Sequence, residues 1–147
     1  MEYQLCYKVI PMPCDTNFNG DIFGGWLLSQ MDLAGVSLCN NVSYGRYVTL
    51  TIDRMVFRKP VKVGDIVEIK GKINKVGNTS IEVDLIVQAT TMETGKQKLV
   101  TEGTIKYVKI NNLGKPISVS SNSQNDSWII LYNKFFFYKH NIFYFFY

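Results

Sequence analysis

Histidine is almost absent from this chain, and its scarcity limits the chemistry that the chain can perform. The one histidine, His140, lies near the C-terminal end of the 147 residues. A serine or cysteine nucleophile needs a neighbouring base, and a metal centre needs several converging ligands. The predicted domain contains no histidine to serve as that base, and no residues have the spacing of metal ligands. The sequence also has neither a dinucleotide-binding glycine motif nor a P-loop. We therefore expect no nucleophilic triad, no metal and no cofactor.

Long blocks of like charge are also missing. The 16 basic and 12 acidic residues give a formal charge of +4 and are spread along the chain. Such a distribution does not indicate a nucleic-acid partner. A mild positive balance would still help to attract an anionic small molecule.

Cysteine is scarce, and its number and spacing indicate neither a disulfide framework nor a closely spaced metal or redox pair. Cys6, Cys14 and Cys39 are odd in number and form no closely spaced pair. No cleavable signal peptide is recognisable at the N-terminus. We expect reduced thiols and a cytoplasmic protein.

The hydrophobic pattern predicts one helix and several strands. Phe23, Leu27, Met31, Ala34 and Leu38 recur at helical spacing, so that a helix should end near residue 40. Elsewhere apolar residues alternate with polar ones, as in half-buried strands. A change of parity near residues 53 and 54 predicts a β-bulge. The expected strands cover approximately residues 4–10, 47–57, 67–73, 81–88 and 99–110.

The order of one strand, one helix and then four strands predicts an α+β domain in which the helix covers an antiparallel sheet. We place the domain at residues 1–118 and a divergent, aromatic-rich tail at residues 119–147. The tail is apolar enough to suggest a membrane span, but it contains lysine, asparagine and histidine, which are costly in a bilayer. Membrane insertion is not expected.

The residues that could carry chemistry are concentrated between positions 17 and 35. Asp32 lies inside the predicted helix beside its apolar stripe, so it is either a catalytic carboxylate or a boundary residue bonded to a neighbouring strand. Gly24 and Gly25 lie at the helix start, where they form either a tight entry turn or a pair of amide donors for a developing negative charge. Amide donors and a carboxylate are sufficient to hydrolyse a thioester, because a thiol is a good leaving group.

Several segments together resemble the YciA-like acyl-CoA thioesterases. The resemblance covers about residues 5 to 118, and the segments occur in the expected order. They are the run 17–26, then 29–32 (SQMD), 44–46 (YGR), 57–61 (FRKPV) and 63–65 (VGD).

The resemblance implies a hotdog fold, in which an antiparallel sheet wraps around one long central helix. It also implies that acyl-CoA is hydrolysed to a fatty acid and coenzyme A, with Asp32 as general base or nucleophile. Gly24 and Gly25 would polarise the carbonyl, and Asp21 would assist. Asp21 has the alternative role of a helix N-cap.

The same resemblance indicates where coenzyme A would bind. The family's ligand follows a strand and turn that correspond here to Asn78, Thr79 and Ser80, and Arg58 with Lys59 forms a nearby basic cluster in the sequence. A solvated face and a plain hairpin are the alternatives. The resemblance also implies homodimers with shared active sites, which often assemble further into trimers of dimers.

A second function remains open. A hotdog domain can bind acyl-CoA without turnover, as a sensor or scaffold. Hotdog dehydratases are discounted, because they use a core histidine that this chain lacks.

Overall fold

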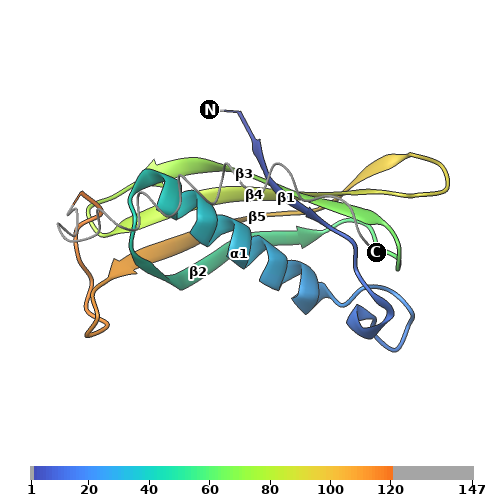
Figure 1. The fold of residues 1–147 in the computed structure, drawn as a ribbon, viewed down its shortest axis with the longest axis horizontal. Coiled ribbons are helices and arrows are strands. Elements are labelled where there is room, and N and C mark those ends of the chain that lie inside the picture. Colours follow the sequence, from blue (N-terminus) through green and yellow to red (C-terminus); the bar gives the residue numbers. More distant parts are fainter. Residues whose placement is uncertain (1, 121–147) are drawn as a thin grey trace, which may run out of the picture.

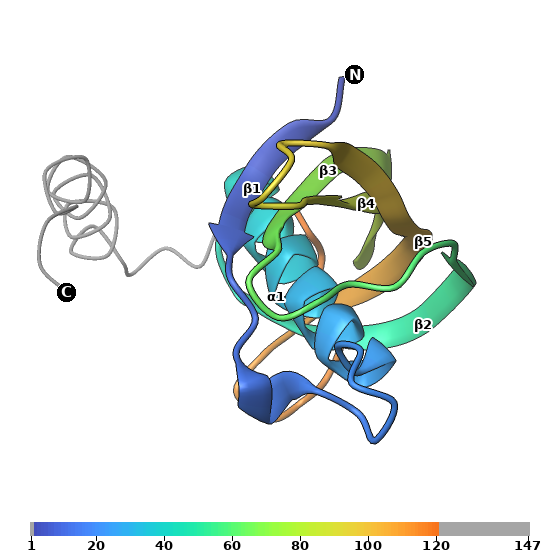
Figure 2. The same ribbon diagram turned by 90° about the vertical axis from the view of Figure 1, so that its right-hand side faces the viewer.

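The fold consists of one long helix packed on a five-stranded antiparallel sheet. The computed structural model describes residues 2–120. The sheet order is β1-β3-β4-β5-β2, and the sheet curves around α1 (Figures 1 and 2). The elements are β1 (Gln4–Val9), a 3-10 turn (Pro13–Asp15), α1 (Gly24–Val42), β2 (Arg46–Phe57), β3 (Ile66–Val76), β4 (Ser80–Thr90) and β5 (Gln97–Ile110). The predicted hotdog fold is confirmed.

Helix α1 buries one stripe of small and apolar side chains against the sheet. Its buried residues are Leu27, Met31, Ala34, Gly35, Leu38 and Cys39. This spacing of three and four residues is the pattern from which the helix was predicted. The helix begins at Gly24, one residue after the start of the hydrophobic pattern at Phe23. Phe23 itself has an extended backbone and donates its N–H to the carbonyl of Asp15. Phe23 is therefore the N-cap, and its ring is mostly exposed.

Strand β4 forms the centre of the core. Its inward residues Ile81, Val83, Leu85, Val87 and Ala89 are fully buried. The opposite face of the sheet carries cross-strand ion pairs, such as Lys106 with Glu82 at 2.9 Å. One face therefore packs against α1 while the other is polar, as expected for an antiparallel sheet with a single covering helix.

Strand β2 is irregular, and its irregularities decide which side chains face the helix. The register with β5 shifts between Asp53 and Val56, which confirms the predicted bulge, and shifts again between Thr49 and Thr51. Thr49 before the first shift, Ile52 between the two shifts and Phe57 after the second all lie opposite residues of β5 that are fully buried. Because opposite residues share a face, these three side chains point toward the α1 side of the sheet.

The bulge holds Arg54 in a left-handed backbone conformation, with φ of 54°. A side chain in this region costs about 1–2 kcal/mol, whereas glycine adopts it without strain. We expect Arg54→Gly to raise the free energy of unfolding by about 1 kcal/mol. Urea denaturation measures the change. The neighbouring substitution Asp53→Gly is the control and should lower stability, and a loss in both variants would contradict a strained bulge.

The packed domain continues to the end of the described residues. Val119 is buried and donates its N–H to the carbonyl of Asn78 at 2.7 Å. Within residues 2–120, no helix is both long and apolar enough to cross a membrane. Most of the predicted aromatic tail lies outside the described residues, so the division at residue 118 remains a prediction.

Candidate active site

Asp32 lies on α1, eight residues after the helix begins, and its side chain is held by the edge strand β2. Thr49 Oγ1 donates a hydrogen bond to Asp32 Oδ1 at 2.6 Å. Asp32 is half-buried. The carboxylate is thus bonded to a neighbouring strand, yet the residue is not fully buried and a reacting molecule can reach it.

A second hydroxyl contacts the backbone of the same residue. Tyr107 of β5 is fully buried and donates to the carbonyl oxygen of Asp32 at 3.1 Å. Thr49 and Tyr107 are opposite each other in the β2–β5 register. Burial raises the pKa of Tyr107 strongly, and the charge of Asp32 raises it further. Its hydroxyl therefore remains a donor.

Gly24 and Gly25 supply two amides at the start of α1. Neither amide has an acceptor among residues 2–120, whereas the next two amides, of Trp26 and Leu27, both donate to the carbonyl of Phe23. The first turn contains no acidic residue, and the N-cap forms no side-chain hydrogen bond. Unpaired amides at a helix N-terminus favour an anion or a developing oxyanion.

Asp21 does not act as the helix N-cap, because that position belongs to Phe23. Its carboxylate forms a close ion pair with Lys62, and its carbonyl accepts a hydrogen bond from the N–H of Asn17 at 2.7 Å. Asp32 lies eight residues inside the helix, or about 12 Å along its axis from Gly24. The structure therefore does not bring Asp21 and Asp32 together within one chain.

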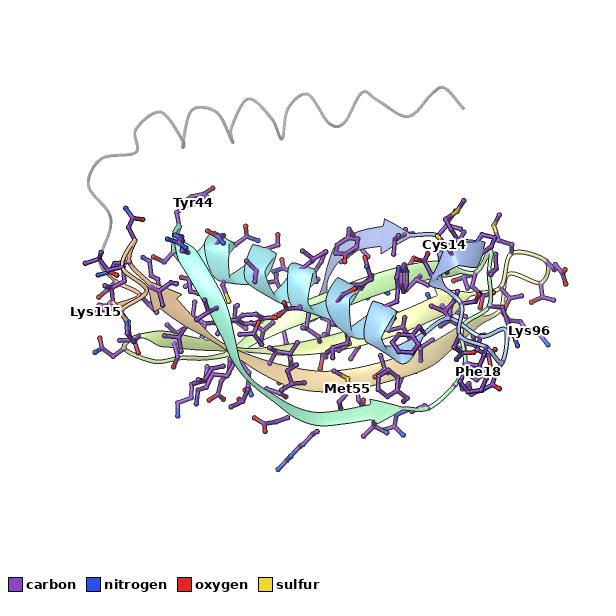
Figure 3. The ribbon with its side chains drawn as sticks, turned by 90° about the horizontal axis from the view of Figure 1, so that it is seen from below. Cys14, Phe18, Tyr44, Met55, Lys96 and Lys115 are labelled. Atoms are coloured by element: carbon purple, nitrogen blue, oxygen red, sulfur yellow. The ribbon has the colours of Figure 1, made fainter. Side chains whose placement is uncertain are left out.

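The basic residues predicted to bind coenzyme A lie at one end of β2. Arg58 forms a close ion pair with Glu102, and its N–H donates to the carbonyl of Val100. Lys59 is exposed. This end of the molecule also carries Phe18, as Figure 3 shows.

The polar turn lies at the other end, together with the segment that contains Lys115 (Figure 3). Ser118 donates to Asn78 Oδ1 at 3.1 Å, and Thr79 accepts the N–H of Lys109. Ser80 pairs with Val108 of β5. Since Val100 and Val108 are about 27 Å apart along a strand, one chain does not unite the turn with Arg58 and Lys59.

Strand β2 is an exposed edge. It lies at the end of the sheet order, and α1 packs mainly against β3 and β4 (Figure 2). An edge strand offers unpaired N–H and C=O groups to a further strand. Five of its apolar side chains are 41–59% exposed: Val48, Leu50, Ile52, Val56 and Phe57. This combination is typical of a surface that a second subunit covers.

The described part of the chain offers few other reactive groups. Burial raises the pKa of Cys39 to about 12, which keeps this thiol protonated. Residues 2–120 contain no group of three metal-binding side chains. Asp32 with the two free amides is therefore the strongest candidate for chemistry in the described residues.

Sequence comparison agrees with the fold. The pattern of the thioesterase superfamily matches residues 19–96, which is just over half of the chain. The acyl-CoA thioester hydrolase YciA of Escherichia coli is 40% identical over 115 residues, covering 76% of this chain and 87% of YciA.

Two solved structures show the same arrangement. A hexameric thioesterase from Yersinia pestis has a TM-score of 0.77 and 39% identity, covering 82% of this chain and 98% of its own. A hexameric hotdog fold thioesterase of Campylobacter jejuni has a TM-score of 0.71 and 42% identity, covering 78% and 90%. The chain belongs to the thioesterase superfamily and, within it, to the family of YciA-type acyl-CoA thioester hydrolases.

Proposed function

We propose that this protein hydrolyses acyl-CoA to a free fatty acid and coenzyme A, with Asp32 as the catalytic carboxylate. The observation that supports the proposal is the position of the Asp32 carboxylate, which Thr49 fixes through Oδ1 at 2.6 Å while the residue stays only half-buried. A positioned carboxylate with an available oxygen can remove a proton from water or attack a carbonyl directly.

The reaction has two possible courses that use the same groups. As a general base, Asp32 takes a proton from water while the water oxygen attacks the thioester carbon. As a nucleophile, it forms a mixed anhydride that water then hydrolyses. In both courses helix amides stabilise the oxyanion, and the thiolate leaves and is protonated. A thiol pKa of about 8.5 means that departure needs little acid assistance.

The amides that stabilise the oxyanion must come from a second subunit. Asp32 is about 12 Å along the helix from the amides of its own chain, which is too far for both to contact one thioester. A two-fold dimer through β2 would place the helix start of one protomer beside Asp32 of its partner. Three such dimers would give a hexamer, the state named for the Yersinia and Campylobacter relatives.

Coenzyme A would bind across a subunit boundary for the same reason. Arg58 and Lys59 lie far along the sheet from the Asn78–Ser80 turn, so both groups can contact one ligand only if two chains contribute. In the proposed assembly Asp21 has an auxiliary role: its ion pair with Lys62 fixes the loop that precedes the helix amides. We propose a cytoplasmic enzyme that needs no cofactor.

The test is a hydrolysis assay on the full chain. A panel from acetyl-CoA to palmitoyl-CoA is supplied, and free thiol release is followed. Release that depends on Asp32 supports the proposal. Saturable binding of acyl-CoA without release would instead establish a non-catalytic binding protein.

The helix amides can be tested by removing one donor. Proline is accepted at the first helical position, and Phe23 already has the extended conformation that a following proline requires. We expect Gly24→Pro to fold normally and to lower kcat by about 100-fold, as for other lost oxyanion donors. Gly24→Ala keeps the amide, and its added methyl would be 3.6 Å from the Phe57 ring, an ordinary contact. Equal activity in the two variants would remove this amide from the mechanism.

A further inference from the structure

Three tyrosines from three strands donate hydrogen bonds to main-chain carbonyls of α1 and its C-cap. Tyr7 of β1 donates to Gln30 at 2.7 Å, Tyr107 of β5 to Asp32 at 3.1 Å, and Tyr47 of β2 to Ser43 at 2.8 Å. Gln30 and Asp32 lie inside the helix, where their carbonyls already accept an amide from the following turn. These extra bonds therefore do more than satisfy a helix end.

We propose that Tyr107 is a positioning residue for catalysis, because its hydroxyl fixes the backbone of Asp32 against the sheet. This inference rests on the proposed role of Asp32. Thr49 and Tyr107 are register partners on neighbouring strands, and both hydroxyls bond to the same helix residue. One bond holds the carboxylate and the other holds the main chain. Together they fix the position and direction of the Asp32 carboxylate.

Gly35 makes this contact possible. A Cβ atom at position 35 would lie 2.6 Å from Cε2 of Tyr107 and closer still to its hydroxyl oxygen. Real side chains do not approach so closely, so the ring would have to move or the helix would have to lift from the sheet. Glycine inside a helix normally costs about 1 kcal/mol relative to alanine. Here it provides the gap through which the hydroxyl reaches Asp32.

The position of the carboxylate matters because catalysis is sensitive to small displacements. A misplacement of about 1 Å can cost up to 100-fold in rate. Tyr107 is buried, and burial raises the pKa of its hydroxyl, so the donor of this bond is protonated near neutral pH. Loss of this hydrogen bond should let the backbone of α1 near Asp32 move away from the sheet, without removing any group that contacts substrate.

The test compares three tyrosine-to-phenylalanine variants of the full chain by kcat, KM and thermal unfolding. Tyr107→Phe should lower kcat about tenfold and leave KM within about twofold. Tyr7→Phe and Tyr47→Phe lose the same kind of hydrogen bond to α1 or its C-cap and are the matched controls. Both should keep kcat within about twofold. A normal kcat for Tyr107→Phe, or an equal loss in all three variants, would overturn the positioning role.

A second variant keeps the test informative if Tyr107→Phe does not fold. Gly35→Ala would normally favour a helix, so a fall in its kcat at an unchanged temperature of unfolding would be due to the displaced Tyr107. We expect a loss of at least tenfold, with KM little changed. Full activity would overturn the inference. Asp32→Asn separates the two proposals: if it is fully active, the catalytic role of Asp32 fails, whereas if it is inactive beside a fully active Tyr107→Phe, only the positioning role fails.

Discussion

Replacing Asp32 with asparagine should lower kcat for acyl-CoA hydrolysis by about 10³-fold, the scale of a lost general base. Asparagine has nearly the same shape, and its carbonyl oxygen can still accept the hydrogen bond from Thr49 that Asp32 Oδ1 accepts at 2.6 Å. The substitution therefore removes the basic oxygen and leaves the packing intact. Thiol release over a range of acyl-CoA concentrations gives kcat and KM separately, and KM should change little.

The matched control is Asp84→Asn. Asp84 also accepts a hydrogen bond from a threonine on a neighbouring strand, Thr104, at 2.8 Å. It lies on β4 between buried inward residues and so belongs to the opposite, polar face of the sheet. Asp84→Asn should keep kcat within about twofold. Similar losses in the two variants would show that the Asp32 effect is structural, and full activity of Asp32→Asn would place the chemistry elsewhere.

The second large effect concerns the exposed edge of the sheet. Leu50 is 59% exposed on β2, at the point where the register with β5 shifts. If β2 pairs with its two-fold copy, Leu50→Asp places two unpaired carboxylates in an apolar interface, which costs several kcal/mol. We expect monomers in analytical ultracentrifugation and a loss of hydrolysis of at least about 100-fold, because each monomer retains only half of a site.

Leu113→Asp controls for the chemistry of the substitution. Leu113 is 81% exposed in the loop after β5 and is not part of strand β2. The variant should keep both its oligomeric state and its activity. A monomeric Leu50→Asp protein with full activity would contradict shared sites, and an unchanged oligomer would show that another surface forms the interface.

Most of the fold could be predicted because it depends on hydrophobic periodicity. The stripe from Leu27 to Leu38 specified α1, and the alternation from Ile81 to Val87 specified β4. The parity change in β2 correctly located the bulge at Asp53. The shift near Leu50 was missed, because single residues on an exposed edge carry little pattern. Phe23 was assigned to the helix because its side chain fits the stripe, but its N–H bonds to Asp15 instead.

The contacts around Asp32 could not be predicted in the same way. Its identification depended on family resemblance, since periodicity alone favoured a structural role. Thr49 and Tyr107 are 58 residues apart, and they meet only because the β2–β5 register places them opposite each other. Two register shifts follow Thr49 along β2, and the sequence reveals only the second of them. Gly35 was informative only in retrospect, as a glycine inside a strong helical pattern.

The central claim, that Asp32 of one protomer works with the helix amides of its partner, can be tested by mixing two inactive variants. Asp32→Asn and Gly24→Pro proteins are combined under conditions that exchange subunits, and thiol release is measured. In random dimers half are mixed, and each mixed dimer contains one intact site, so about a quarter of wild-type activity should return. A mixture no more active than the average of the separate variants would show that each site is built within one chain.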